Sequence, residues 1–266
     1  MTLVAQRNGS TATAADLAPL AFAGFAHFTA MQVRDGKVRG LDLHLDRLRR
    51  ASMEMFGVAL TDAQVRACLR AAIPALSADL SLTAMVYSPA GEFVVAGPEV
   101  TPEVLVRTGE PSSGPRGPLR LAVFEHERVL AHIKHVGEVA KTYWLRQAVA
   151  QGFDDAAFMD RAGRLGEASI WNLAFWDGEG VIWPEADVLQ GTTMSIVQRQ
   201  LAAMGVPQRS AIVTRDDVAA MSGAVVMNSW TPGIAVTQIG SVALPDAPAF
   251  VGQLHEAYAR EPLVSP

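Results

Sequence analysis

Lysine is rare in this chain, and two of its three lysines lie close together. Lys134 and Lys141 stand in the stretch VLAHIKHVGEVAKTYW, between an apolar segment and a predicted helix. The remaining cations, 22 less 3, are nineteen arginines. A lysine amine can lose its proton and form an imine with an aldehyde, which a guanidinium cannot do. Lys134 is therefore a candidate nucleophile, although a single lysine before a helix is most often only a surface residue.

A second candidate site is the start of a helix that could bind an anion. The stretch QGTTMSIVQRQL is a turn of small residues that leads into a predicted helix. The free N–H groups of Thr192 and Thr193 would face an anion, with the helix dipole behind them, and the Thr193 hydroxyl adds a donor. Taken alone, a Gly-Thr-Thr helix start is more often a simple N-cap.

The N-terminal part of the chain must hold strands and helices that support these residues. FAHFTAMQVRDGKVRGLDLHL predicts a hairpin that turns at its Asp-Gly pair. A helix should follow, capped near Asp42 and ended by Gly57, and a second helix should begin at the capping box Thr61–Gln64. LSLTAMVYSPAGEFVVAG predicts another hairpin around residues 89–91, and EVLVR predicts a further strand.

The composition changes at residues 108–118, TGEPSSGPRGP, where three prolines and three glycines exclude a helix or a central strand. Beyond it we expect the strand LRLAVFE, a helix from about 135 to 151 and a helix near 191–204. Short strands are predicted at AAFMD, GRLGE, NLAFW, VIW, AVVMNSW and GIAV. The pattern predicts an α+β fold with domains at 1–110 and 119–266 and a linker at 111–118.

Composition and charge exclude several classes of protein. No apolar run approaches the ~20 residues that span a bilayer, and the first twenty residues lack the pattern of a signal peptide. A net charge of −5 argues against a nucleic-acid or membrane surface. The single cysteine, Cys68, excludes an internal disulfide and a cysteine metal cluster and suits a reducing cytosol. We expect a soluble, globular, cytoplasmic protein without a metal site.

Six short motifs occur in a set order between about Phe25 and Ile239. They are His-x-x-Arg-Leu at 44–48, the lysine at 134, Gly-Phe-Asp-Asp-Ala at 152–156, Glu167 with Asn-Leu at 172–173, Leu-x-Gly-x-Thr at 189–193, and a closing Asn-Ser…Ile-x-Val. Together they resemble the fold-type IV pyridoxal-phosphate enzymes, or class IV aminotransferases. This family includes branched-chain and D-amino-acid aminotransferases and aminodeoxychorismate lyase. The resemblance implies a small α/β N-terminal domain, a larger C-terminal pseudo-barrel domain that binds pyridoxal 5′-phosphate (PLP), and a homodimer.

The resemblance gives Lys134 the role of the Schiff-base lysine. Lys141 is the rival, about two helical turns further on and on roughly the same face. The spacing to Glu167 matches the family from Lys134 and is seven residues short from Lys141. Glu167 would face the pyridine nitrogen and keep it protonated, and the alternative is that Glu167 is a solvated turn residue.

The resemblance also implies a phosphate site and a ring contact. Arg47 would supply charge to the phosphate, although Arg49 and Arg50 beside it make a solvated helix face an alternative. The other residues implied to hold the cofactor are Leu189 on one ring face, the helix start at Thr192 and Thr193, and the backbone N–H groups of Ser229 and Trp230.

The chain departs from the usual aminotransferase pattern on the substrate side. Thr29 stands where a strand glutamate is usual, Gln32 lies near the usual basic position, and Val139 replaces a tyrosine five residues past the lysine. IKHVGEV and NSWTPGIAV are closer to the lyase. Thr29 could relay a proton or could simply be a strand residue. Trp171 and Trp230 could line a bulky amphipathic pocket or belong to the core.

We therefore expect a PLP-dependent aminotransferase that transfers an amino group between an amino acid or amine and a 2-oxo acid. The alternative is 4-amino-4-deoxychorismate lyase, which would release pyruvate in folate synthesis. A third hypothesis is a non-catalytic homologue that binds the cofactor without turnover. The partners expected are small-molecule donors and acceptors and a second copy of the chain, and neither nucleic acid nor a membrane.

Overall fold

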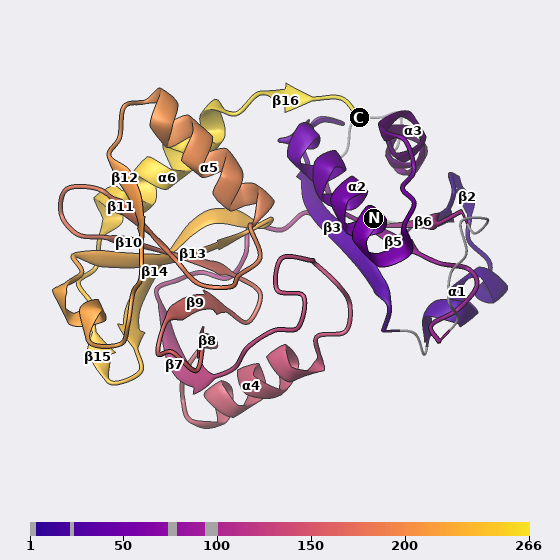
Figure 1. Ribbon diagram of the computed structural model, residues 1–266. Helices are drawn as coiled ribbons and strands as arrows, with labels where there is room; N and C mark the ends of the chain where they lie inside the picture. The colour runs from indigo at the N-terminus through magenta and orange to yellow at the C-terminus, as the bar shows by residue number, and fades with distance from the viewer. Residues whose placement is uncertain (1–3, 22–23, 74–78, 94–100) are drawn as a thin grey trace. The chain divides into compact units, whose positions relative to one another are not determined.

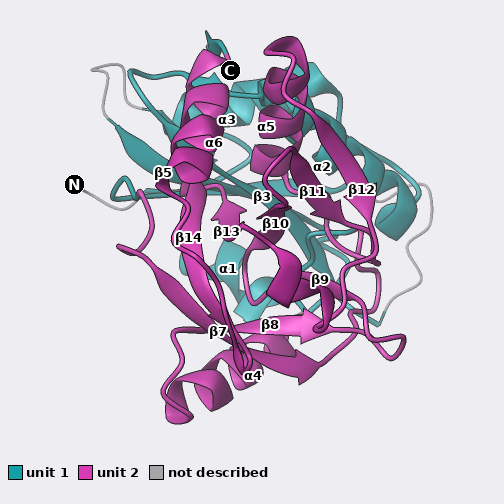
Figure 2. Ribbon diagram, turned by 90° about the vertical axis from the view of Figure 1, so that its left-hand side faces the viewer, with its two compact units in different colours: residues 1–112, 133–137, 262–266 teal, residues 113–132, 138–261 magenta. Residues whose placement is uncertain are grey.

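The computed structural model describes residues 4–21, 24–73, 79–93 and 101–266, and its contacts divide the chain into two units (Figure 2). Unit 1 comprises residues 1–112, 133–137 and 262–266, and unit 2 comprises residues 113–132 and 138–261. The main division falls within the predicted linker. The two units exchange short segments, however, so that residues 133–137, with Lys134 among them, belong to unit 1.

Unit 1 is an antiparallel sheet with helices packed on it (Figure 1). The sheet has the order β2-β1-β6-β5-β3, and a small separate sheet pairs β16 with β4. Its strands are β1 (Ala5–Arg7), β2 (Ser10–Thr11), β3 (Ala26–Val33), β4 (Val38–Arg39), β5 (Leu80–Tyr87), β6 (Glu103–Gly109) and β16 (Leu263–Val264), and its helices are α1 (Ala14–Ala21), α2 (Leu41–Phe56) and α3 (Asp62–Ala72).

The apolar faces of β3, β5, β6, α2 and α3 form one core, in which Leu45, Leu48 and Leu69 are among the buried side chains. The predicted hairpin turns at Asp35 and Gly36, which both have positive φ angles, 50° and 69°. Two central residues in this conformation are what a tight hairpin turn requires.

Helix α2 ends and helix α3 begins where the sequence predicts. Gly57 terminates α2 with φ 71°, and the Thr61–Gln64 capping box opens α3. The predicted cap at Asp42 is wrong, because the N-cap of α2 is Gly40 in a left-handed conformation and Asp42 lies in the first turn. Part of the predicted second arm of the 89–91 hairpin falls at residues 94–100, outside the described residues.

Unit 2 is built around a closed ring of six strands, in the order β10-β13-β14-β7-β8-β9, with β9 pairing back to β10. β11 and β12 extend this sheet from β10, and β15 pairs with β14. Its strands are β7 (Leu119–Glu125), β8 (Asp155–Met159), β9 (Leu165–Ala168), β10 (Asn172–Trp176), β11 (Val181–Pro184), β12 (Gln208–Ala211), β13 (Gly223–Asn228), β14 (Thr231–Ile239) and β15 (Val242–Ala243). Its helices are α4 (Val139–Ala150), α5 (Thr192–Ala203), the short 3-10 helix η1 (Asp217–Ala220) and α6 (Pro248–Arg260).

The apolar strand β13 shows why a barrel forms. Ala224 and Val226 point into the core inside the ring, whereas Val225 and Met227 point into a second core beneath α5 and α6. Successive side chains of a strand face opposite sides, so a strand buried on both sides is apolar throughout. Figure 1 shows α5 and α6 together over this outer face. The predicted pseudo-barrel is thus confirmed.

The helix predicted from about residue 135 begins instead at Val139, so that boundary is wrong. Residues 134–136, just before this helix, pair with β3 instead: Phe28 N–H donates to the Lys134 carbonyl (2.8 Å), and Val136 N–H donates to the Ala26 carbonyl (3.0 Å). The segment therefore lies against β3. A sequence window cannot reveal this pairing, because its partner lies more than a hundred residues away.

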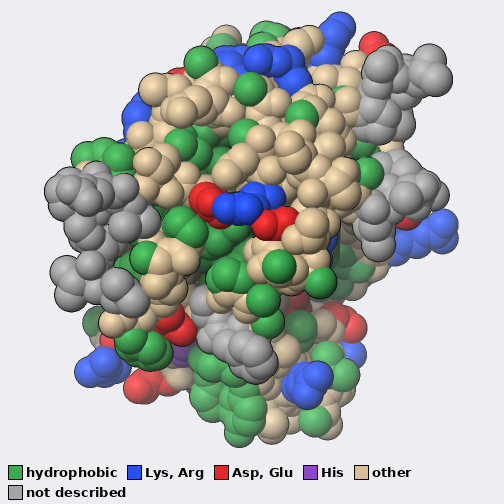
Figure 3. Space-filling model, turned by 90° about the vertical axis from the view of Figure 1, so that its right-hand side faces the viewer, with side chains coloured by type: hydrophobic (Ala, Val, Ile, Leu, Met, Phe, Trp, Pro, Cys, Tyr) green, Lys and Arg blue, Asp and Glu red, His purple; other side chains and the backbone are tan. Residues whose placement is uncertain are grey.

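The described surface carries charged side chains of both signs. Figure 3 shows one face, on which basic and acidic side chains lie side by side near the centre and a group of basic side chains lies at the top edge. None of the described helices is long and apolar enough to cross a membrane. Among the described residues, no three His, Cys, Asp or Glu side chains gather as metal ligands would.

Candidate active site

Glu167 is a buried carboxylate on β9, only 6% exposed. Its Oε1 lies 3.1 Å from Lys141 Nζ and 3.3 Å from Arg128 Nη1, and its Oε2 accepts a hydrogen bond from Leu189 N–H (3.4 Å). Three donors thus hold one buried acid, as burial of a charge requires. The alternative of a solvated turn residue is excluded by this environment.

Arg128 and Glu138 complete a chain of alternating charges around Glu167. The Arg128 side chain is 4% exposed, donates through Nε to Glu138 (2.6 Å) and donates through Nη1 to the Ala131 carbonyl (2.7 Å). Glu138 is the N-cap residue of α4, and its carbonyl accepts from the Lys141 N–H (3.2 Å). The order is Glu138, Arg128, Glu167 and Lys141, two anions and two cations.

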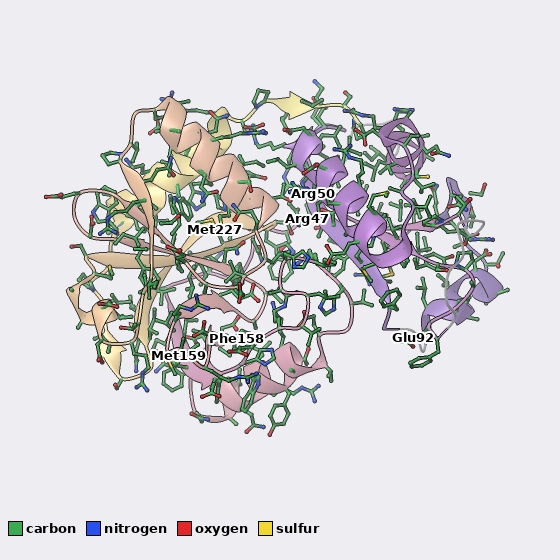
Figure 4. The ribbon with its side chains drawn as sticks, viewed as in Figure 1. Arg47, Arg50, Glu92, Phe158, Met159 and Met227 are labelled. Carbon is green, nitrogen blue, oxygen red and sulfur yellow. The ribbon has the colours of Figure 1, made fainter. Side chains whose placement is uncertain are left out.

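Burial changes the proton affinity of Lys141 and His126. It lowers the pKa of Lys141 below its usual range, and the neighbouring Glu167 opposes that shift. Burial likewise lowers the pKa of His126, whose ring makes an edge-to-face contact with Phe158 on β8 (4.8 Å; Phe158 is labelled in Figure 4). A buried amine that binds its proton less tightly is more often neutral, and only the neutral amine can act as a nucleophile.

Glu167 also borders a cavity of ≈ 150 Å³, which His126, Arg128, Arg164 and Val188 help to line. Gly166 beside it is required for packing, because a Cβ there would lie 2.7 Å from Val188 Cγ1. The segment that carries Leu189 can approach Glu167 closely only because residue 166 has no side chain.

The start of α5 forms a second part of the site within unit 2. Thr192 and Thr193 are buried, and no side chain among the described residues caps the helix at Gly191. Within the described chain, Thr192 Oγ1 is buried without a hydrogen-bond partner. Buried polar atoms are rarely left so. An unpaired hydroxyl beside uncapped helix N–H groups suits a bound anion such as a phosphate.

Asn172 connects these two parts. Its Nδ2 donates to the Leu189 carbonyl (2.7 Å), while Leu189 N–H donates to Glu167. A Cβ on Gly191 would lie 1.9 Å from Asn172 Oδ1, so the helix start packs directly on this amide. Glu167 and the α5 start are therefore held in a fixed relation. Leu189 itself is buried, 9% exposed.

The turn between β13 and β14 holds Ser229 and Trp230. The Trp230 N–H, predicted to bind a phosphate, donates to Asn228 Oδ1 (2.8 Å). Trp230 is 38% exposed and makes an edge-to-face contact with Trp171, which is buried and donates through Nε1 to Asp155 (2.8 Å). Trp171 therefore belongs to the core of unit 2, in agreement with the second of its two readings from the sequence.

The remaining predicted residues lie in unit 1. Lys134 is positioned by its backbone bond to Phe28, and its Nζ lies 4.8 Å from the centroid of the Phe28 ring, a cation–π contact. Arg47 lies on α2 (Figure 4), half-buried, and burial lowers its pKa to about 10. It stays protonated at neutral pH, and it is not simply part of a solvated face.

Thr29 is fully buried, and its Oγ1 lies 2.6 Å from Nδ1 of the buried His44. The contact gives Thr29 a structural partner on α2, and its role as a proton relay stays a prediction.

Sequence reasoning missed Arg128 and Glu138 and gave Lys141 only as a rival. Arg128 stands six residues before Lys134 in EHERVLAHIK. A signal was present, since an arginine so close to a candidate nucleophile can pair with a buried carboxylate. Its partner Glu167 is thirty-nine residues away in the chain, which hides the pair from a local reading.

The fold of this chain, with its closed six-stranded ring, is also found in solved structures. The model of the family described as class IV amino-transferases matches residues 26–239. The chain belongs to the class IV aminotransferase family, whose enzymes are PLP-dependent aminotransferases and lyases. No curated protein sequence matches it.

Three solved structures illustrate the similarity. A branched-chain aminotransferase from Thermoproteus uzoniensis with norvaline has a TM-score of 0.82 at 19% identity, covering 97% of this chain and 94% of that one. The branched-chain amino acid aminotransferase from Escherichia coli has a TM-score of 0.81 at 14% identity, with 96% and 92% covered. A putative 4-amino-4-deoxychorismate lyase from Legionella pneumophila has a TM-score of 0.77 at 18% identity, with 87% and 89% covered. At such identities the likeness concerns the fold.

Proposed function

We propose that this protein is a PLP-dependent aminotransferase that exchanges an amino group between an amino acid or amine and a 2-oxo acid. The observation that carries the proposal is the pairing of a buried carboxylate with an uncapped helix start. Glu167 and the α5 N-terminus are joined through Leu189 and Asn172. A cofactor with a ring nitrogen at one end and a phosphate at the other requires both features.

The residues of unit 2 fit the cofactor. Glu167 would accept a hydrogen bond from the ring nitrogen and keep its proton there. The unpaired Thr192 hydroxyl and the N–H groups of Thr192 and Thr193 would hold the phosphate. Leu189 would pack on a ring face. When bound, PLP supplies an electron sink that stabilises negative charge on the substrate α-carbon.

The roles of Lys134 and Arg47 in this proposal rest on the sequence motifs. Lys134 would carry the cofactor through its amine, and its freed Nζ would move a proton to and from the substrate. Arg47 would add charge for the phosphate. Ser229 and Trp230 are proposed as further backbone donors, for which the Trp230 N–H would exchange Asn228 Oδ1 for the phosphate, and Thr29 is proposed as a proton relay.

The lyase is retained as a second candidate because of particular residues. Thr29, the Lys-His pair at 134–135 and the NSWTPGIAV ending favour it. Val139, where branched-chain enzymes have a tyrosine, is 83% exposed. A lyase would eliminate pyruvate from aminodeoxychorismate rather than return a proton to the cofactor. The non-catalytic alternative would bind PLP without turnover.

Absorbance and product analysis distinguish the three hypotheses. The purified protein, loaded with PLP, should be yellow and should bleach with borohydride. Amino donors should then release an oxo acid and shift the spectrum to the pyridoxamine form. Pyruvate and an aromatic amine formed from aminodeoxychorismate would instead establish the lyase, and a yellow protein that turns over neither would be non-catalytic. A protein that never acquires the chromophore contradicts the proposal.

We further propose that the enzyme is a homodimer, as the family resemblance suggests. We also propose that it is cytoplasmic, as its single, buried Cys68 suggests. Sedimentation velocity should give a dimer. A stable monomer with full activity would contradict this part of the proposal.

A further inference from the structure

Glu167 already has several hydrogen-bond and ionic partners, although its proposed role is to bind the ring nitrogen of the cofactor. Its Oε1 faces both Lys141 Nζ (3.1 Å) and Arg128 Nη1 (3.3 Å), and its Oε2 accepts from the Leu189 N–H. A protonated ring nitrogen would be a third cation at the same buried acid. Since like charges repel strongly where water is excluded, one of the cations must give way.

Arg128 is fixed in place. Its side chain is 4% exposed, and it is held at Nε by Glu138 and at Nη1 by the Ala131 carbonyl as well as by Glu167. To leave Glu167, the planar guanidinium would have to give up hydrogen bonds to acceptors that match its geometry. Arg128 is therefore a permanent partner of this carboxylate.

Lys141 is the cation that can move. It lies in the first turn of α4, a helix in which Ala148 is the buried residue, and its neighbours Val139 and Tyr143 are 83% and 54% exposed. The Lys141 side chain is already 13% exposed, and a lysine has a flexible stem that can carry its ammonium outward.

We propose that Lys141 is a placeholder cation for Glu167, which competes with the ring nitrogen of the cofactor and leaves Oε1 when the cofactor binds. This inference rests on the proposed function. In the cofactor-free protein, Lys141 helps to neutralise a buried acid. On loading, the ring nitrogen takes its place while Arg128 and Leu189 keep the carboxylate oriented.

The charged groups that face Lys141 agree with this role. Glu167 on β9 and Glu138 at the start of α4 favour its charged form, and Arg128 and burial disfavour it. His126, after β7, belongs to the same electrostatic cluster. Burial thus weakens the hold of Lys141 on its proton, so the positive charge beside Glu167 can be lost as well as displaced.

Cofactor affinity of the Lys141→Met variant tests the proposal. The variant leaves Glu167 paired with Arg128 and Leu189, so it should fold, and Lys141→Gln serves if it does not. With the competing charge gone, PLP should bind about tenfold or more tightly than to the wild type, since two cations about 5 Å apart repel appreciably even at an effective dielectric constant of about 20. Equilibrium titration by fluorescence quenching measures this directly.

Two control variants and one mapping experiment separate the outcomes. Lys141→Arg keeps the charge and should bind PLP no more tightly than the wild type. Lys37→Met makes the same change as K141M at an exposed turn and should bind PLP like the wild type. Unchanged or weaker binding by K141M would overturn the proposal, as would finding the borohydride-fixed cofactor on Lys141. If no protein binds PLP, wild type included, the proposed function fails first and this inference with it.

Discussion

Substitution of Gly191 by alanine tests whether the helix start and the carboxylate are coupled as the structure shows. The new Cβ would lie 1.9 Å from Asn172 Oδ1, so the amide must move. Overpacking of this kind costs about 1–3 kcal/mol. Movement of Asn172 also breaks its bond to the Leu189 carbonyl, worth about 0.5–1.5 kcal/mol. The free energy of unfolding should therefore fall by about 1.5–4.5 kcal/mol.

Gly252 provides a matched control, because a Cβ there meets nothing within 4 Å and the residue lies inside α6. Gly252→Ala should be neutral or more stable by up to about 1 kcal/mol, as alanine is in a helix interior. Urea unfolding of the cofactor-free variants measures both changes. PLP affinity should fall in G191A and stay unchanged in G252A.

A double-mutant cycle shows whether Asn172 is the cause. Asn172→Ala removes the obstructing amide, so the addition of G191A to it should cost much less than G191A costs in the wild type. If G191A is as stable as the wild type, or if its cost is the same with and without Asn172, the described packing of the helix start is refuted.

Three further predictions concern single groups. Thr192→Val removes an unpaired buried hydroxyl, so the cofactor-free protein should be as stable or more stable by about 1–3 kcal/mol while its affinity for PLP falls; a loss of stability in urea unfolding would contradict this. Burial lowers the pKa of His44 from 6.5 to about 3 and that of His27 from 6.5 to about 4. The free energy of unfolding should therefore fall as the pH drops from 6.5 towards these values, by up to about 1.4 kcal/mol per pH unit for each group. His44→Asn should flatten this fall in thermal melts. Because burial lowers the pKa of Lys141, stability should rise as pH increases from this lowered pKa towards the usual lysine range, and K141M should lack that rise in melts between pH 7 and 10.

Local signals in the sequence were sufficient for much of unit 1. An Asp-Gly pair between strands and a Thr-x-x-Gln helix start both act through atoms a few residues apart. The turn at Asp35 and the capping box at Thr61 are both present in the structure. The α2 cap was mispredicted because glycine at residue 40 adopts a left-handed conformation, which leaves no side-chain signature.

Long-range pairing accounts for what the sequence concealed. The helical pattern before Val139 was overridden by backbone bonds from residues 133–137 to β3. The closure of the ring rests on one pairing, Asn172 with Glu167, and the buried state of Glu167 depends on Arg128 and Lys141. A charged residue in a sequence is expected to be exposed unless it has a partner of opposite charge. The partners in the four-charge cluster are distant in the chain, so the cluster could be identified only from the structure.

The location of the cofactor on the chain tests the central claim most directly. Trypsin cuts after lysine and arginine but not after a modified lysine, and cleavable residues stand at 128, 134, 141 and 146. Borohydride reduction of the PLP-loaded protein, followed by mass spectrometry, should give an uncut peptide 129–141 that carries one phosphopyridoxyl group on Lys134. An uncut labelled peptide 135–146 would assign the cofactor to Lys141 instead, and the absence of any labelled peptide would contradict the account altogether.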